Sequence, residues 1–429
     1  MANLKTIQII KNYKSPKGYY NGPAIKLGAG VLAYEAYTAA SEAGYRVLGG
    51  TCSTVGLVGG YTQGGGHSLL SSLYGLSADN VLEWEVVTPK GQHIVATPHN
   101  GHRDLYYALS GGGGGTYGVV LSMTTRLHPD GPVGSATLAF SARDGDGDGG
   151  LDAFWDAVSA WHAYSPKLVD AGLAVFYHIV NGRFQTLSVA APGLNETRVH
   201  ALFQPFVDQL TTNHTGVSVS GFATRPADPG FLAHFNRDLG PLPFGWMAPS
   251  QLTGSRMIPR SLVRDPAANA KISDAMRLAT ASGHFYFGCG LLNASRFPHK
   301  GYENAVNPAW RGALSHCLVV GPWDFGASTD SGKRGIMMDR LDELTNYITP
   351  ALEVATPGSG TYLNEANFLQ RDWQRQFYGG GKGHYYAKLL GIKRRYDPQG
   401  LLYAVTAVGS EGWFADEQGR LCPKKKYER

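Results

Sequence analysis

A glycine-rich run near the amino terminus carries a side chain that could react. Residues 49–66 read GGTCSTVGLVGGYTQGGG, and eight of these eighteen residues are glycine. Glycine lacks a Cβ and tolerates positive φ, so such a run lets backbone amides approach a bulky, often anionic ligand. Cys52 lies inside the run, and its thiol is a potential nucleophile. The pattern therefore predicts a loop that wraps a dinucleotide and holds it covalently.

Short strands and helices on both sides must position this run. Their hydrophobic periodicity predicts a compact α+β arrangement with little room for long helices. The expected strands are 24–31, 45–48, 81–88, 92–96 and 116–129, and the expected helices are 32–43 and 104–109. A run of five glycines, residues 111–115, separates the second helix from the last strand.

One segment imitates the opening of a nicotinamide-dinucleotide site. A strand leads into Gly28-x-Gly30-x-x-Ala33 and then into a helix, as in a Rossmann fingerprint. That fingerprint needs an acidic residue about 20 residues further on to hold the ribose, whereas residues 48–51 read LGGT. The missing acid argues against a nicotinamide-dependent enzyme, which stays an alternative that would bind its cofactor reversibly.

The central third predicts an antiparallel sheet with helices on one side. Asn181-Gly182 lies between two alternating runs within 171–190, which is a strong hairpin signal. Helices are expected over 151–164, 198–210 and 334–348, a strand over 215–222, and helical, aromatic structure over 365–397. Asp144, Asp146 and Asp148 have EF-hand spacing, but Trp155 stands where the twelfth ligand must be a glutamate. We therefore expect a flexible turn there and no metal site.

The composition describes a soluble globular chain. Of its 429 residues, 43% are hydrophobic and 17% are charged, which suits two or three domains. The net charge is only +5, and a basic run at 424–426 supplies three of these charges from a solvated terminus. No apolar run is long enough to span a bilayer. We therefore expect a monomer that acts on a small molecule and binds neither nucleic acid nor membrane.

Sequons and cysteines bear on the compartment. Three Asn-x-Ser/Thr sequons begin at Asn195, Asn213 and Asn293. Together they indicate a secreted glycoprotein, although no signal peptide is visible at the start of the chain. The four cysteines are too few for a disulfide framework and lack zinc-ligand spacing. If Cys52 is committed to a cofactor, an odd number is left, namely Cys289, Cys317 and Cys422.

Several spaced motifs, taken in order, resemble one enzyme family. The N-terminal motifs are GGTCSTVGLVGGYTQGGGHS, YGLSADNVLEWEVV, DLYYALSGGGGGTYGVV and LHPDGP, and the C-terminal motifs are YLNEANFLQRDWQRQFYG, LLGIKRRYDPQGLLY and VGSEGW. They resemble the FAD-binding domain and the closing segment of the berberine bridge enzyme-like oxidases, within the vanillyl-alcohol-oxidase superfamily. The resemblance covers the first third and the last fifth of the chain.

This resemblance implies a fold and a reaction. It implies part of a PCMH-type FAD-binding domain over residues 1–132, a substrate domain over 133–355, and a C-terminal segment over 356–429 that returns to the first domain. The fold class is α+β, with an antiparallel sheet flanked by helices in the substrate domain. The implied reaction moves hydride from a small-molecule alcohol, amine or saccharide carbon to flavin N5, with O₂ as acceptor, in secondary metabolism.

The resemblance also places the cofactor. The cysteine that Cys52 matches can bond the flavin ring, so a 6-S-cysteinyl link is implied, which would raise the flavin's redox potential; a small buried core cysteine is the alternative. Glycine amides are expected to line the pyrophosphate, and residues 79–81 and 116–119 the adenosine. The implied cofactor-binding residues are Cys52, Thr54, Val55, Gly56, Gly59, Gly60, Tyr61, Gly64, Gly65, Gly66, His67, Asp79, Asn80, Val81, Thr116, Gly118, Val119 and Asn364.

Two tyrosines are the implied catalytic residues. Tyr362 and Asn364 match a Y-x-N motif that the family places over the flavin, where Tyr362 would take the substrate proton if a neighbouring charge lowered its pKa. Glu365 is adjacent, but alternation along a strand would point it the other way. Tyr61 is expected to donate a hydrogen bond to the reduced ring, and His67 to be a structural loop residue. Packed aromatic side chains are the alternative for both tyrosines.

The front of the chain departs from the family pattern. The family begins with a longer FAD-binding half, which carries a signal peptide and a loop whose histidine makes a second flavin bond, and this chain starts beyond both. We therefore expect a truncated form of a secreted parent, no bicovalent flavin, and an incomplete wall around the phosphates. A non-catalytic remnant that holds no flavin is the second hypothesis.

Overall fold

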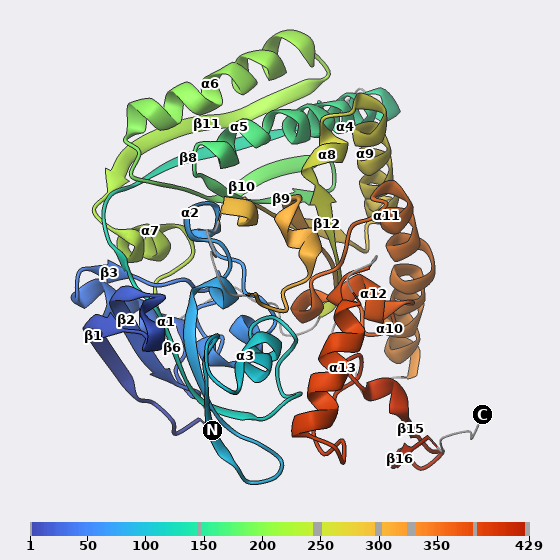
Figure 1. The fold of residues 1–429 in the computed structure, drawn as a ribbon. Coiled ribbons are helices and arrows are strands. Elements are labelled where there is room, and N and C mark those ends of the chain that lie inside the picture. The colour runs from blue at the N-terminus through green and yellow to red at the C-terminus, as the bar shows by residue number, and fades with distance from the viewer. Residues whose placement is uncertain are drawn as a thin grey trace.

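Two sheets with their helices make up the molecule, and the chain passes from the first sheet to the second and back (Figure 1). The computed structural model describes residues 2–143, 147–242, 251–296, 303–323, 331–380 and 384–424. Mixed helix and antiparallel sheet confirm the predicted α+β class. The domain boundaries at 132/133 and 355/356 stay predictions.

The first sheet is built from short β-branched segments near the amino terminus. In spatial order it comprises β1 (Ile7–Lys14), β2 (Asn21–Gly28), β6 (Val119–Arg126), β4 (Val81–Val87) and β5 (His93–Ala96). Its core takes side chains from α1 (Ala33–Glu42), α3 (Arg103–Leu109), α12 (Trp373–Tyr378) and α13 (Tyr385–Tyr396). The C-terminal helices thus share the core of the N-terminal sheet, and Figure 1 shows α13, in red, beside α3.

The pairing of this sheet excludes a Rossmann site. Each neighbouring pair of its strands is antiparallel, whereas a doubly wound dinucleotide fold needs parallel strands around the first glycine turn. Gly28 has a different role, because a Cβ there would lie 2.3 Å from the carbonyl oxygen of Leu4. The glycine pattern therefore serves close backbone packing, and the nicotinamide alternative is wrong.

The second sheet is the larger one and is also antiparallel. In spatial order it comprises β11 (Val217–Asp228), β8 (Val133–Ala142), β10 (Arg183–Pro192), β9 (Ala174–Val180), β13 (Tyr286–Leu291), β14 (Ala313–Pro322) and β12 (Gln251–Pro259). The predicted hairpin between β9 and β10 forms at Asn181 and Gly182, whose φ values are +48° and +69°. Only glycine and asparagine adopt such angles readily, so these two residues fix the register.

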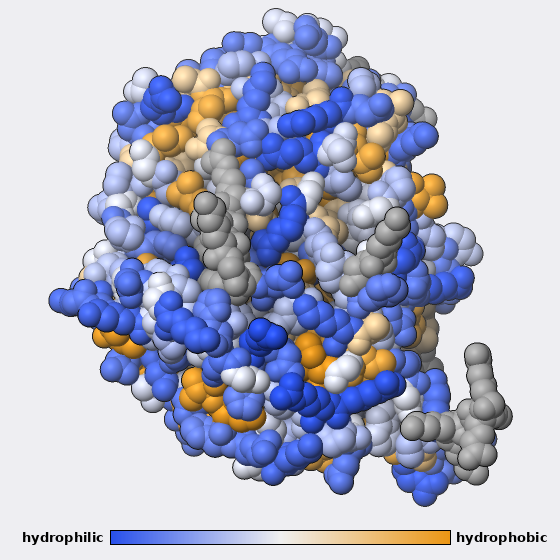
Figure 2. Space-filling view, viewed as in Figure 1, coloured by the Kyte–Doolittle hydropathy of each residue, from blue (hydrophilic) through white to orange (hydrophobic). Residues whose placement is uncertain are grey.

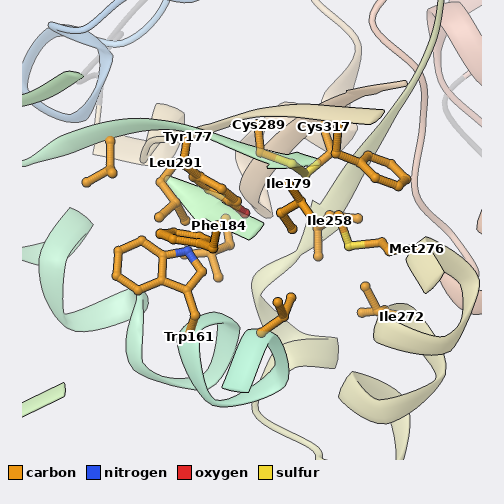
Figure 3. Close-up of a cluster of buried hydrophobic side chains, with 14 of the residues drawn as sticks. Trp161, Tyr177, Ile179, Phe184, Ile258, Ile272, Met276, Cys289, Leu291 and Cys317 are labelled. Atoms are coloured by element: carbon orange, nitrogen blue, oxygen red, sulfur yellow. A yellow bond between two sulfur atoms is a disulfide. The ribbon is translucent and has the colours of Figure 1, made fainter. Parts of the chain in front are cut away.

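Helices cover one face of this sheet and enclose its core. They are α4 (Gly147–Tyr164), α6 (Glu196–Asn213), α9 (Pro266–Thr280) and α11 (Thr349–Ala355). Figure 3 shows Trp161 of α4 against Tyr177 and Phe184 of the sheet, with ring centroids 5.8 and 5.1 Å away. A disulfide joins Cys289 to Cys317 between β13 and β14. The opposite face of the sheet is left to line a cavity.

The remaining elements are short or lie at the edges. They are β3 (Tyr45–Arg46), α2 (Ser71–Tyr74), β7 (His128–Pro129), α5 (Pro166–Asp170), α7 (Phe231–Asp238), α8 (Arg260–Val263), α10 (Ser331–Glu343), β15 (Trp413–Ala415) and β16 (Leu421–Pro423). The prediction of continuous helical structure over 365–397 is wrong before α12, because residues 366–372 form turns. Asp144 and Asp146 of the EF-hand-like run lie outside the described residues.

The visible surface is mostly hydrophilic, with small apolar patches scattered among charged side chains (Figure 2). Such scattered apolar groups are usual on soluble proteins. None of the helices in the described ranges joins the length to the apolar character that crossing a bilayer requires.

Candidate active site

A cavity of about 980 Å³ lies between the N-terminal glycine-rich loop, the second sheet and the C-terminal segment. One wall is the glycine-rich loop of residues 50–61, and the other is the uncovered face of the second sheet. The implied site residues that line it are Cys52, Val55, Gly56, Gly59, Gly60, Tyr61, His67, Tyr362 and Asn364. The volume lies at the upper end of the range for small-molecule and cofactor sites.

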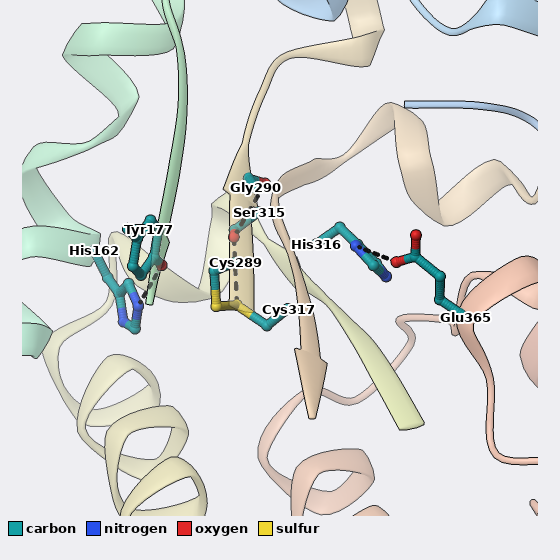
Figure 4. The surroundings of a disulfide bond; sticks show 8 residues. All are labelled: His162, Tyr177, Cys289, Gly290, Ser315, His316, Cys317 and Glu365. Atoms are coloured by element: carbon teal, nitrogen blue, oxygen red, sulfur yellow. Dashed lines mark hydrogen bonds and ion pairs between the residues drawn. A yellow bond between two sulfur atoms is a disulfide. The ribbon is translucent and has the colours of Figure 1, made fainter. Parts of the chain in front are cut away.

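Strand alternation decides which side chains of the second sheet reach the cavity. His316, Leu318 and Val320 of β14 line it, while the intervening Cys317 and Val319 belong to the hydrophobic core. This is the period of two that a strand imposes. Figure 4 shows the two sides: the disulfide lies on one side of β14, and His316 points to the other, toward Glu365.

Two histidines and a glutamate form the polar centre of the cavity. Nε2 of His67 lies 3.2 Å from Oε1 of Glu365, and Nδ1 of His316 lies 3.5 Å from Oε2. The three come from the glycine-rich loop, the second sheet and the C-terminal segment, so the fold brings together residues almost 300 positions apart. The side chain of Glu365 is 32% exposed, and it opens to the cavity.

The electrostatics of this cluster keep Glu365 charged. Burial alone would raise the pKa of its carboxyl group, but the imidazoles of His67 and His316 outweigh burial and hold that pKa at about 2. Burial lowers the pKa of His316 to about 4, against the opposing pull of Glu365. At neutral pH the cavity therefore presents a carboxylate beside a neutral His316 imidazole.

Glu365 corrects our expectation from strand alternation. Tyr362 is extended, but the next residues form one turn of 3₁₀ helix, Leu363–Glu365. In such a turn side chains at i and i+3 lie on the same side, so Tyr362 and Glu365 both face the cavity. Reading the segment as a strand, with a period of two, gave the wrong direction.

Tyr362 lies in the cavity but does not have the lowered pKa that the sequence hypothesis required. Burial, followed by the nearby negative charge of Glu365, raises the pKa of its phenol well above the ordinary value. Its hydroxyl accepts hydrogen bonds from the amide of Gly66 at 3.1 Å and from Nδ2 of Asn364 at 2.7 Å. The geometry favours Tyr362 as an orienting hydroxyl rather than a base.

Tyr61 is also committed within the protein. Its hydroxyl donates to the carbonyl oxygen of His67 at 2.7 Å, so the proton that we expected to reach the flavin holds the loop instead. His67 is more than a structural loop residue, because its ring reaches Glu365.

Part of the glycine run is suited to hold a flat, bulky cofactor. Gly56, Gly59 and Gly60 line the cavity, and no atom lies within 4 Å of a Cβ built on any of them. Bare backbone thus faces open space beside the Cys52 thiol. These residues fit FAD and would hold its ring system within reach of Cys52.

The rest of the glycine run packs against the protein. The amides of Gly64, Gly65 and Gly66 donate to the carbonyl of Gly60, the carbonyl of Thr62 and the hydroxyl of Tyr362. A Cβ on Gly64 would lie 2.2 Å from Oδ1 of Asn364. Gly64 is thus needed for the close approach of Asn364, and Gly66 for that of Ser77 and Tyr61. The amides of all three glycines are bonded within the protein rather than turned to a pyrophosphate.

The residues implied for the adenosine side lie away from this cavity. Those implied site residues that do not line it are Thr54, Gly64, Gly65, Gly66, Asp79, Asn80, Val81, Thr116, Gly118 and Val119. Asp79 is fully buried and binds Arg311, and the carbonyl of Thr116 accepts from Lys393 Nζ at 2.8 Å. A Cβ on Gly118 would lie 2.4 Å from Val86. Their roles toward FAD stay predictions.

Sequence reasoning missed most of the opposite wall. The missed residues include Phe176, His178, Leu187, Asp238, Leu239, Tyr286, Gly288, Gly290, His316, Leu318 and Val320. No local motif marks them, because the register of the second sheet places most of them on one face, and α7 brings Asp238 and Leu239 to it. Glu365 alone carried a signal, since it adjoins the Y-x-N motif.

Comparison with known proteins decides the family. Residues 20–97 match the model of the FAD binding domain, and residues 361–408 match the model "berberine and berberine like". The chain is 45% identical over 423 residues, which is 98% of its length and 70% of the relative's, to the VAO-type flavoprotein oxidase VAO615 of Thermothelomyces thermophilus. The chain belongs to the VAO-type, berberine bridge enzyme-like FAD-linked oxidoreductases. It is therefore an FAD-dependent enzyme acting on a small molecule.

Solved structures show the same fold for this oxidoreductase. The VAO-type flavoprotein MtVAO615 from Myceliophthora thermophila C1 superposes with a TM-score of 0.89 at 45% identity, over 99% of this chain and 73% of that one. A glucooligosaccharide oxidase from Acremonium strictum with a 6-S-cysteinyl, 8α-N1-histidyl FAD superposes with a TM-score of 0.71 over 96% and 81% of the chains. Its identity is only 16%, so it supports the fold alone.

The thiol of Cys52 is expected to react in a strongly pH-dependent way. Burial, followed by the negative charge of Glu365, raises its pKa to about 11. The thiolate is the nucleophile, so its fraction and the alkylation rate should rise about tenfold per pH unit between pH 7 and 10. The measurement is mass spectrometry of iodoacetamide-treated, flavin-free protein. Cys422 serves as the internal control, and a Cys52 rate that levels off below pH 9 would contradict the expectation.

Proposed function

We propose that this chain is an oxidase of a bulky, largely apolar alcohol, with Cys52 linked covalently to the FAD and O₂ as electron acceptor. The observation that carries the proposal is the cavity itself, which holds Cys52 beside open glycine backbone and the charged Glu365 cluster. FAD, when bound, supplies the acceptor for a hydride from the substrate carbon. The chain's own residues bind the substrate and accept its proton.

The walls favour an uncharged, apolar substrate. Apolar side chains make up much of this cavity wall, namely Phe176, Leu187, Leu318 and Val320 of the second sheet and Leu239 at the end of α7. Asp238 is the second carboxylate in the lining, but Arg225 and Arg237 contact it at 3.1 Å each. The polar side chains of this wall include His178, Gln251, Thr253 and Tyr286, and a saccharide would need more polar partners than these. Of the three substrate classes, alcohol, amine and saccharide, we therefore favour an alcohol, and we propose that it is a secondary metabolite.

Glu365 is the proton acceptor in this proposal. A substrate hydroxyl beside the exposed edge of its carboxylate would donate a hydrogen bond to it, and the proton would move to Glu365 as the carbon is oxidised. His67 and His316 orient the carboxylate from two sides. Tyr362 and Asn364 fix the loop that faces the substrate.

The absorbance spectrum of purified protein and of its acid-precipitated pellet tests the proposal. Yellow colour that stays with the pellet is expected, because a thioether survives acid, and Cys52→Ala is expected to release the colour into the supernatant. Cys422→Ala is the matched control and should change nothing. Colour in the supernatant of the wild type would contradict the covalent link, and a colourless protein would favour the non-catalytic alternative, which no observation supports so far.

We also propose that the protein is secreted as a monomeric glycoprotein. The disulfide supports an oxidising compartment, and Asn195 and Asn213 are exposed at the two ends of α6. Asn293 is buried, and its Oδ1 accepts from the amide and hydroxyl of Ser295. Glycans are therefore expected on Asn195 and Asn213 and not on Asn293, as peptide mass spectrometry before and after deglycosylation would show. A glycan on Asn293, or none elsewhere, would contradict this.

A further inference from the structure

The donor atoms of the Glu365 cluster have the composition and spacing of a metal site. One nitrogen each from His67 and His316 and a carboxylate oxygen of Glu365 all lie within 4.8 Å of one another. Nε2 of His67 lies 3.2 Å from one carboxylate oxygen of Glu365, Oε1, and Nδ1 of His316 lies 3.5 Å from the other, Oε2. Four ligands at 2.0–2.1 Å around a tetrahedral Zn²⁺ lie about 3.3 Å apart, so a cation placed among these atoms would require little movement.

Packing fixes the two imidazoles. The His67 ring stacks with Phe176 and with Trp310, at centroid distances of 5.8 and 5.9 Å. The ring of Tyr362 meets it edge-on, at a centroid distance of 5.4 Å. Trp310 and Tyr362 also contact His316, at 5.5 and 5.4 Å. Rings locked in this way lose little entropy on binding an ion, which favours a preformed site.

The remaining ring nitrogens place no constraint on the imidazoles. Nδ1 of His67 and Nε2 of His316 are buried and have no hydrogen-bond partner among the described residues. Without an ion, the nitrogens that face Glu365 donate to its carboxylate. With an ion bound, each neutral ring would carry its proton on the other nitrogen, and the facing nitrogen would be the ligand.

The open side of the cluster points to a catalytic kind of site. Structural zinc sites close four protein ligands around the ion, whereas catalytic ones leave a position for water or substrate. Here the protein supplies three donors, and the exposed edge of Glu365 faces the cavity. Two imidazoles and one carboxylate suit a borderline first-row cation better than Ca²⁺ or Mg²⁺, which prefer oxygen ligands.

We propose that His67, His316 and Glu365 bind one Zn²⁺-like divalent cation, with its vacant position directed into the substrate cavity. Binding of the cation does not depend on the oxidase activity. Its use, polarising a substrate oxygen while the second carboxylate oxygen of Glu365 stays available to the substrate proton, rests on the function proposed above.

Isothermal titration of chelator-treated holoprotein with ZnCl₂ tests the proposal. One ion per chain is expected with micromolar or tighter affinity, and CaCl₂ should give no heat. His316→Gln and Glu365→Gln are each expected to weaken Zn²⁺ binding at least 100-fold. The control is His284→Gln, which removes an exposed histidine 3.1 Å from Glu343. No third donor joins this pair among the described residues, so the variant should leave the affinity unchanged.

Two results would overturn the proposal: no stoichiometric Zn²⁺ binding by the wild type, or binding that neither pocket variant weakens. The flavin spectrum of each variant verifies its fold. Because the two variants lie at separate positions, the test remains possible if one of them does not fold. Failure of the oxidase proposal would be seen separately. If the chain binds Zn²⁺ but no alcohol reduces its flavin, the metal site stands and the proposed reaction is wrong. If the chain oxidises an alcohol but binds no Zn²⁺, the reaction stands and the metal site is wrong.

Discussion

Replacing Glu365 by glutamine is expected to slow reduction of the bound flavin by about 10²–10⁴-fold, the range that a general base contributes. Glutamine keeps the shape of the side chain and loses its ability to accept a proton. The measurement is anaerobic stopped-flow bleaching of the flavin by the best substrate from an alcohol panel. The Zn²⁺ content of each sample is measured alongside, so that loss of a base and loss of an ion are told apart.

The cavity offers few other groups that could take the proton. Among the described lining residues, Asp238 is the other carboxylate, and it accepts from Ser188 and from two arginines. The raised pKa of Tyr362 keeps its phenol protonated across the working range. The effect of Glu365→Gln should therefore exceed that of Tyr362→Phe, which we expect to be below tenfold.

A surface variant with the same chemistry is the control for this prediction. Glu343 also contacts a histidine, His284, and neither residue lines the cavity, so Glu343→Gln should reduce flavin at the wild-type rate. Equal or larger loss in Tyr362→Phe than in Glu365→Gln would reinstate the tyrosine base that the sequence implied. An unchanged rate in Glu365→Gln would remove the carboxylate from the reaction.

The N-terminal half of the cavity was predictable because local chemistry encodes it. A run of glycines around Cys52 has few structural uses, and it does form the wall that fits a cofactor. The hairpin at Asn181-Gly182 was predictable for the same reason, since both residues must adopt positive φ. Where a residue's role is set by its own backbone, the sequence is sufficient.

The other half was not predictable, because it depends on long-range register. His316 reaches the cavity only because β14 pairs with β12 and β13 in one register. A slip by one residue would turn His316 toward the hydrophobic core and Cys317 toward the cavity. The predicted direction of the Glu365 side chain was wrong because of a single 3₁₀ turn, Leu363–Glu365, which no residue type in the segment indicates. Similarly, Gly64 and Gly66 were assigned to phosphate, although their missing side chains make room for Asn364, Ser77 and Tyr61.

Asp79→Ala is expected to destabilise the protein by about 3 kcal/mol, since removing one partner of a buried ion pair costs about 3–5 kcal/mol. The Asp79 carboxylate is fully buried and accepts from both terminal nitrogens of Arg311 at 2.7 Å each. It also accepts from Nδ2 of Asn304 at 2.6 Å. We choose the lower end of the range because the Arg311 side chain is 36% exposed and regains water. Thermal unfolding should show a midpoint about 3 °C lower.

Two further variants sharpen this prediction. Glu303→Ala removes an exposed partner of Lys388 and should cost less than about 1 kcal/mol. The double variant Asp79→Ala/Arg311→Ala should lose less than the sum of the two single variants, because no unpaired buried charge is left. If the losses of stability in the two single variants simply add, or if the unfolding midpoint of Asp79→Ala is unchanged, the Asp79–Arg311 pair does not stabilise the fold.

The consequence should extend to the cavity, because Asp79 also accepts from the amide of Leu76 at 2.8 Å and caps the 3₁₀ turn Ser77–Asn80. The amides of Ser77 and Ala78 in that turn donate to the carbonyls of Gly66 and Gly65, at 2.8 and 2.9 Å. His67 follows Gly66 directly in the chain. Loosening the cap should therefore loosen the loop that presents this imidazole, so Asp79→Ala should reduce flavin more slowly even at temperatures where it remains folded. A variant that unfolds earlier but reduces flavin at the wild-type rate would confine Asp79 to stability.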